Sequence, residues 1–188
     1  YILIMKCVRE MIRIPVVTLN IVLAPSLSPH FTQHIIERYL IPKYTANVDN
    51  ERERKKIEKI LRSLDRVFVR TVYPLDTNIV KPALLGRTVY GAIKKALNIG
   101  GQPLNYPTIY GIFFDEEDIV YNTVIITLPN PKSNRETTLL TTELIVPNVE
   151  GELIIEDLPD KNYRPSIIQI GSGAKYGYGM IKIRWPED

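Results

Sequence analysis

Apolar residues along the first half of the chain follow both strand and helix patterns. The run Val16 to Leu23 (VVTLNIVL) alternates and is rich in β-branched residues, which predicts a strand. Behind Ser28-Pro29, apolar residues recur at helical spacing, and we expect Pro42 to end this helix. The run Asn50 to Leu64 (NERERKKIEKILRSL) predicts a second helix with one apolar stripe and charges of both signs elsewhere, so most of it is expected to face water.

The second half is expected to consist mainly of strands. Before it, Val67 to Val72 predicts a strand, and Leu84 to Leu97 (LLGRTVYGAIKKAL) predicts a helix that Gly100-Gly101 ends. Apolar, β-branched runs then alternate with Pro, Asn, Asp and Gly punctuation. The expected strands are Thr108 to Phe114, Ile119 to Leu128, Thr138 to Val146, Gly151 to Glu156, Ser166 to Ile170 and Met180 to Trp185. The mixture predicts an α+β fold, and no repeat of solenoid length is visible.

Length and composition narrow the class of protein. The chain has 188 residues, 45% of them apolar, which fits one compact domain spanning residues 1–188, with the charged helix around 50–64 as an insertion. No apolar run approaches a bilayer span, so we expect no membrane partner and a cytoplasmic location. A single cysteine and two histidines exclude an internal disulfide and an ordinary zinc site. Abundant Ile, Leu and Val, with few Gln, is compatible with a thermophile.

The segment with the most informative chemistry is Ile170 to Ile183 (IGSGAKYGYGMIKI). Its spacing, G-x-G-x-x-x-G-x-G before a strand, matches neither the P-loop nor the dinucleotide fingerprint, so we expect no nucleotide cofactor. Glycines can turn backbone N–H groups toward anionic oxygens. Lys175 adds a cation, and Tyr176 and Tyr178 add faces for base stacking. A tight structural hairpin is the alternative interpretation.

A second segment places a glycine, a cation and a hydroxyl at the start of a helix. Gly86, Arg87 and Thr88 begin it, and Lys94 and Lys95 follow. The first N–H groups of a helix lack partners and favour anions, so this start is a possible phosphate site. An ordinary capped helix with solvated lysines is the alternative. The formal charge of +3 permits an anionic partner without requiring one.

Together the two segments resemble the CRISPR-associated RAMP (repeat-associated mysterious protein) superfamily, in which such a helix start precedes a C-terminal glycine-rich loop. The stretch Thr142 to Glu156 resembles the family's strand, turn and strand with an acidic residue. The resemblance covers about Leu84 to Ile183. In the family pattern a proline and a hydroxyl stand where this chain has Leu85 and Arg87. The resemblance implies a ferredoxin-like (RRM-type) antiparallel sheet with helices on one face, plus insertions, and binding to CRISPR RNA.

The resemblance also implies two possible routes of RNA cleavage. Processing endoribonucleases of the superfamily use a histidine near the first helix, and His30 and His34 lie in that stretch. A partly buried structural histidine pair is the alternative. Effector subunits use an acidic residue after the first strand, for which Asp76 is the nearest candidate, although Asp-Thr-Asn is equally typical of a turn. We interpret Asp115 to Asp118 as a solvated turn and expect no metal site.

RNA binding without catalysis fits the residues best. The first hypothesis is a CRISPR RNA-binding subunit of a type III-like effector complex, with copies of itself or sibling subunits as partners. A processing endoribonuclease and a protein-interaction module with a purely structural glycine loop are the alternatives. The residues expected to bind RNA are Gly86, Arg87, Thr88, Lys94, Lys95, Gly171, Ser172, Gly173, Lys175, Tyr176, Gly177, Tyr178 and Gly179. This hypothesis predicts that the helix start and the glycine loop meet on one side of a small sheet.

Overall fold

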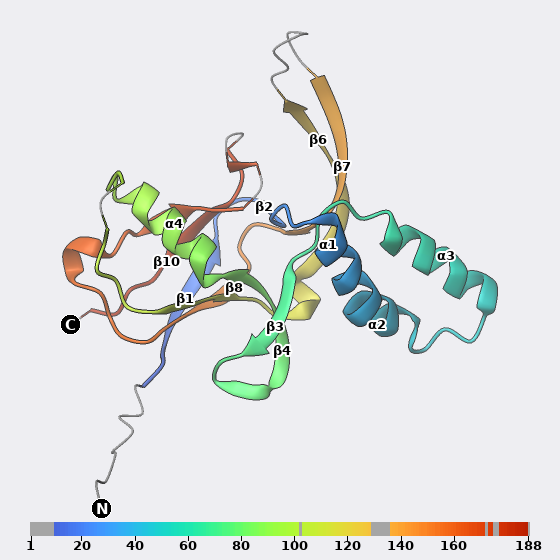
Figure 1. Cartoon of the computed structure of the whole chain (residues 1–188), viewed down its shortest axis with the longest axis horizontal. Coiled ribbons are helices and arrows are strands. Elements are labelled where there is room, and N and C mark those ends of the chain that lie inside the picture. The colour runs from blue at the N-terminus through green and yellow to red at the C-terminus, as the bar shows by residue number, and fades with distance from the viewer. Residues whose placement is uncertain (1–9, 102, 129–135, 172, 175–176, 188) are drawn as a thin grey trace, which may run out of the picture.

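The computed structural model shows an α+β protein with two antiparallel sheets (Figure 1). It describes residues 10–101, 103–128, 136–171, 173–174 and 177–187. The larger sheet has seven strands and the smaller has three. The α+β class that the apolar pattern predicts is therefore confirmed.

The seven-stranded sheet forms the body of the molecule. In spatial order its strands are β3 (Val69–Tyr73), β4 (Asp76–Leu85), β5 (Ile109–Phe113), β8 (Glu150–Ile155), β1 (Ile12–Thr18), β10 (Met180–Ile183) and β9 (Ile167–Gln169). All neighbouring strands in it are antiparallel. Helix α4 (Gly86–Ala96) lies across one face (Figure 1) and buries Val89 and Ile93 against the strands. This packing forms the main hydrophobic core, and burial of such apolar side chains is the main stabilising contribution.

The three-stranded sheet consists of β2 (Val22–Leu23), β7 (Glu136–Ile145) and β6 (Ile119–Leu128). β6 and β7 pair along ten residues and form the long hairpin that projects at the top of Figure 1. Their ends continue into β5 and β8 of the larger sheet through short connections. The hairpin therefore extends from the body of the protein.

The remaining helices form a separate cluster. They are α1 (Pro29–Ile35), the π-helical turn η1 (Ile36–Leu40), α2 (Ile41–Thr45) and α3 (Glu51–Arg62). Their apolar side chains, among them Ile36, Leu40 and Leu61, pack on one another, and Tyr121 of β6 packs against them. The expectation that helices cover one face of the sheet is thus correct for α4 but wrong for α1 and α2, which pack with α3, the helix expected as an insertion.

Two expected boundaries are wrong for identifiable reasons. The single strand expected over Val16 to Leu23 is interrupted at Asn20, whose side chain bonds to the segment before β10, so β1 and β2 belong to different sheets. The helix expected to end at Pro42 continues into α2. A proline ring normally clashes with the carbonyl four residues earlier. Here the wider π turn, in which the Ile41 N–H donates to the Ile36 carbonyl, accommodates Pro42.

Strand β4 was not expected from the pattern. Its polar start at Asp76 and its internal Pro82 interrupt the apolar alternation that marks a strand. Pairing on both sides, with β3 and β5, nevertheless holds the segment extended up to Leu85. Tertiary pairing therefore overrides a weak local preference.

Candidate nucleic-acid interface

The glycine-rich loop connects β9 to β10 at one end of the large sheet. Its described glycines are Gly171, Gly173, Gly177 and Gly179, all with φ between 82° and 91°. Residues that carry a side chain rarely adopt this left-handed backbone conformation, so it favours glycine at these positions. Ser172, Lys175 and Tyr176, which are expected RNA-binding residues, lie outside the described residues.

Close packing adds a second requirement at two of these glycines. A Cβ on Gly179 would lie 1.8 Å from the Ile170 carbonyl oxygen, and one on Gly171 would lie 2.7 Å from the Leu23 carbonyl oxygen. A Cβ on Gly177 would meet no atom within 4 Å. The loop is therefore seated against β2, while its tip at Gly177 is open to solvent.

Two amide side chains fasten the loop. Asn20 donates to the Gly177 carbonyl at 2.5 Å and accepts from the Met180 N–H at 2.8 Å. Gln169 donates to the carbonyls of Ala174 and Tyr178 at 2.7 and 3.2 Å. Because each amide bonds to two points of the loop, these side chains tie the described part of the loop to the segment after β1 and to β9.

Three backbone N–H groups at the C-terminal end of the loop, those of Gly177, Tyr178 and Gly179, already donate hydrogen bonds within the protein. Gly177 and Tyr178 donate to carbonyls within the loop, at 3.2 and 3.3 Å, and Gly179 donates to the Ile21 carbonyl at 2.8 Å. These three groups are therefore not free to bind phosphate. Phosphate binding at this loop would therefore depend on cationic side chains or on other N–H groups.

Tyr178, which was expected to stack on bases, and Tyr90 of α4 are both packed within the protein. Tyr178 is half-buried against Leu23 and its neighbours in the small sheet. The Tyr90 hydroxyl donates to the Leu104 carbonyl at 3.1 Å, and its ring contacts Tyr106 edge-on, at 6.3 Å between centroids. Both rings thus have a structural function in this conformation.

The start of α4 and the glycine loop lie at opposite ends of the sheet. Gly86 packs on the backbone of Ile109, where β5 begins, and in register with it Ile155 pairs with Ile12 at the start of β1. The loop precedes β10, where Ile181 pairs with Thr18 at the end of β1. The expectation that Gly86, Arg87 and Thr88 lie next to the glycine loop is therefore wrong. The antiparallel register separates them by the length of the sheet.

The end of α4 approaches the loop instead. Lys95 and Ala92 line a mainly apolar groove together with Gln169 and Met180, the residues at the two ends of the loop. Lys182, on β10, alternates with Ile181 and Ile183 of the main core, so its exposed side chain points away from α4. Lys95 and Lys182 thus flank the base of the loop, while Lys94 lies over the Tyr90 ring at 5.8 Å.

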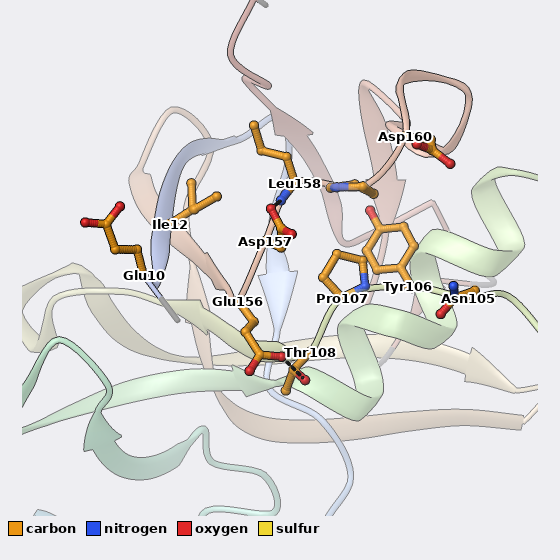
Figure 2. A pocket seen from close by; sticks show the side chains of 11 residues that line it. Glu10, Ile12, Asn105, Tyr106, Pro107, Thr108, Glu156, Asp157, Leu158 and Asp160 are labelled. Carbon is orange, nitrogen blue, oxygen red and sulfur yellow. Dashed lines mark hydrogen bonds between the residues drawn. The ribbon is translucent and has the colours of Figure 1, made fainter. Parts of the chain in front are cut away.

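An acidic hollow lies at the end of the sheet where α4 begins. It has a volume of about 800 Å³ and carries four carboxylates, those of Glu10, Glu156, Asp157 and Asp160 (Figure 2). Glu156 accepts a hydrogen bond from the Thr108 hydroxyl at 2.7 Å. Negative charge here repels phosphate, which disfavours an RNA path across the helix start.

The residues expected for cleavage do not form a catalytic group among the described residues. His30 and His34 are exposed on α1, where His34 stacks on Phe31 at 6.4 Å between ring centroids. The Asp76 carboxylate accepts from the Asn78 backbone N–H at 3.0 Å, which is the turn that was the alternative interpretation. No group of potential metal ligands is found in the part of the chain that the structure describes.

The stretch Asp115 to Asp118 is less solvated than expected. Lys81 bonds to Asp115 at 2.8 Å, and Arg70 binds Glu116 through two nitrogens. Burial, followed by repulsion from neighbouring acids, raises the pKa of Asp118. The segment is a helical turn that supports an internal ion pair rather than a free acidic surface.

Sequence reasoning missed the most deeply buried charges. Glu143 of β7 is fully buried and accepts from Arg70 at 2.5 and 2.8 Å and from the Phe68 N–H at 2.7 Å. Burial opposes charge on Arg70, but hydrogen bonds and attraction from Glu143 and Glu116 raise the pKa of its guanidinium. The sequence did carry one signal of this buried pair, namely a single acidic residue, Glu143, within an otherwise uncharged and largely apolar stretch. The network ties β3 to the small sheet.

Comparison with known proteins assigns no relative: no family model matches this chain, and no curated protein matches it. In the described part of the chain, no helix is both long enough and apolar enough to cross a membrane.

Proposed function

We propose that this protein is a CRISPR RNA-binding subunit of a multi-protein, type III-like effector complex, with other subunits or copies of itself as partners. The proposal rests first on the order of the two motifs, a glycine-containing helix start followed by a C-terminal glycine-rich loop, over Leu84 to Ile183. On this proposal the protein is a member of the RAMP superfamily, whose members bind CRISPR RNA.

The order of the central strands supports a ferredoxin-like (RRM-type) core. β10, β1, β8 and β5 are neighbours in that order. α4 directly precedes β5 at the end of the long connection that starts after β1, and β8 lies between β1 and β5. The connection from β8 to β10 carries a short helical turn (Lys161–Tyr163) and β9 where a second long helix would complete the pattern. Such sheets offer a platform for single-stranded RNA.

The observation that carries the proposal is the glycine loop itself, whose described residues are tied down by two amide side chains and have a cation nearby on each face of the sheet. Its four described glycines have left-handed conformations, and Asn20 and Gln169 bond to the described part of the loop near the edge of the sheet. Lys95 and Lys182 lie on either side of its base. A glycine-rich loop with two cations nearby suits the phosphates of a single strand, which can approach closely because glycine has no side chain.

The direct test is binding of single-stranded CRISPR repeat RNA by the full chain in EDTA, with the salt concentration varied. We expect binding, and we expect the RNA to remain intact. Lys95→Gln with Lys182→Gln should weaken binding and reduce the salt slope by about 1.4, since each single-strand phosphate contact contributes about 0.7.

Arg87→Gln is the control, because Arg87 is exposed at the start of α4, at the other end of the sheet from the glycine loop. It should leave the salt slope unchanged. Absence of RNA binding would favour the protein-interaction module, and cleavage in EDTA that depends on His30 or His34 would favour the processing endoribonuclease. Equal effects of the Arg87 variant and the lysine pair would contradict the proposed RNA path.

A further inference from the structure

Helix α3 holds the whole positive excess of the protein. Its twelve residues, Glu51–Arg62, contain six basic and three acidic side chains, a net charge of +3. The formal charge of the entire chain is also +3, so the remaining residues are balanced. The RNA path proposed above makes no use of this helix.

The helix presents its cations on the face opposite its packing contacts. Ile57 and Leu61 pack on the cluster formed by α1 and α2. At 100° per residue, Arg52, Lys56 and Lys59 lie within about 60° of one another on the opposite side. All three are exposed. In Figure 1, α3 lies at the edge of the molecule, away from the large sheet.

These three cations differ from the others on the helix in having no acidic partner among the residues that the structure describes. Lys55 pairs with Glu51 at 2.7 Å, Arg54 with Glu58 at 3.6 Å, and Arg62 with Glu37 of the neighbouring π turn at 2.6 Å.

By contrast, Arg52, Lys56 and Lys59 form no ion pair with any residue within the described ranges. Their axial separations are about 6 and 4.5 Å, from a rise of 1.5 Å per residue. The helix thus carries an unneutralised row of positive charge directed to solvent.

We propose that this row, Arg52, Lys56 and Lys59, is a second RNA-binding site that contacts the phosphate backbone without reading bases. The inference rests on the proposed function for the identity of its ligand. It assigns a role to the helical insertion, which holds RNA outside the path at the glycine loop. Long flexible cations on a projecting helix suit backbone contacts, which depend on charge rather than on sequence.

Two other anionic surfaces fit the row less well. A membrane-surface helix needs a broad apolar face to insert, but the apolar face of α3 is used in packing and leaves only Ile60 largely exposed, at 54%. Protein interfaces are depleted in lysine and are anchored by buried apolar or aromatic side chains, which this face lacks. Charge complementarity therefore favours nucleic acid.

The test compares two charge-matched variants of the full chain in binding to an unstructured single-stranded RNA. Arg52→Gln/Lys56→Gln/Lys59→Gln should lower the affinity at low salt by about tenfold or more and the salt slope by about 2, from about 0.7 for each contact. Arg54→Gln/Lys55→Gln/Arg62→Gln removes the same charge from paired positions and should have a much smaller effect. Glutamine preserves helix propensity, and circular dichroism checks the fold.

Equal losses of affinity in the two variants would overturn the inference, because net charge alone would then explain binding. No loss of affinity in the first variant would also overturn it. Tighter, row-dependent binding to phosphatidylserine vesicles or to polyglutamate than to RNA would also overturn it. The loop variant Lys95→Gln/Lys182→Gln separates the two proposals. If only the α3 variant loses affinity, the site on α3 stands and the proposed path at the glycine loop fails.

Discussion

Removal of the Glu143 carboxylate is expected to destabilise the protein strongly. Glu143 is fully buried and binds Arg70, which is itself only 6% exposed. Arg70 lies in β3 of the large sheet and Glu143 in β7 of the small sheet, so the pair joins the two sheets. Glu143→Gln keeps the shape but leaves the guanidinium with Glu116 as its remaining acidic partner. Breaking a buried pair by removing one partner typically costs about 3–5 kcal/mol.

That cost is a large share of the total stability of a domain, about 5–15 kcal/mol. Urea unfolding measures it. With a slope of about 3 kcal/mol per molar, at the upper end for a small protein, the midpoint should fall by about 1–1.7 M. Glu37→Gln, which removes the partner of Arg62 in an exposed pair, serves as the control and should cost less than about 1 kcal/mol.

Replacement of both partners distinguishes the cost of leaving one buried charge unpaired from the net contribution of the ion pair to stability. Arg70→Met with Glu143→Leu removes two buried charges together, and such replacements are often neutral or stabilising. We therefore expect the double variant to be more stable than Glu143→Gln. A loss for Glu143→Gln no larger than that for Glu37→Gln would show that the buried network contributes little, and the reasoning from burial would be wrong.

Further predictions concern the glycine loop, the start of α3 and the acidic turn. Gly179→Ala should destabilise more than Gly177→Ala in thermal unfolding, because both have positive φ, but only at Gly179 would a Cβ strike backbone; equal losses would contradict this. Asn50→Ala should cost about 1 kcal/mol, since Asn50 caps two N–H groups of α3, and Asn50→Asp should restore most of it. Burial raises the pKa of Asp118 in the folded state, so this carboxyl contributes stability that is present below its ordinary pKa and is lost as the pH rises through the raised value. Asp118→Asn should therefore raise Tm at neutral pH, with a difference that disappears near pH 3, and a constant difference across this range would exclude the linkage.

Local pattern was sufficient for the elements whose sequence carries its own signals. The strand expected over Ile119 to Leu128 has these bounds in the structure, because its β-branched run is long and pairs along its full length. The helix after Asn50 begins where the capping side chain predicts. The glycines at Gly171 and Gly179 were recognisable because their spacing needs a backbone reason.

The arrangement of these elements depended on contacts between residues far apart in the chain. Antiparallel register placed the start of α4 at the opposite end of the sheet from the glycine loop, and no local pattern encodes which end a helix start will face. Ion pairs within α3 and with distant residues likewise determine which cations of α3 are neutralised. Lys55 has an acidic partner one turn away, whereas Arg62 is neutralised by Glu37, 25 residues earlier. Periodicity reports which face of an element is apolar, but charge pairing and register depend on which elements become neighbours, and only long-range packing determines that.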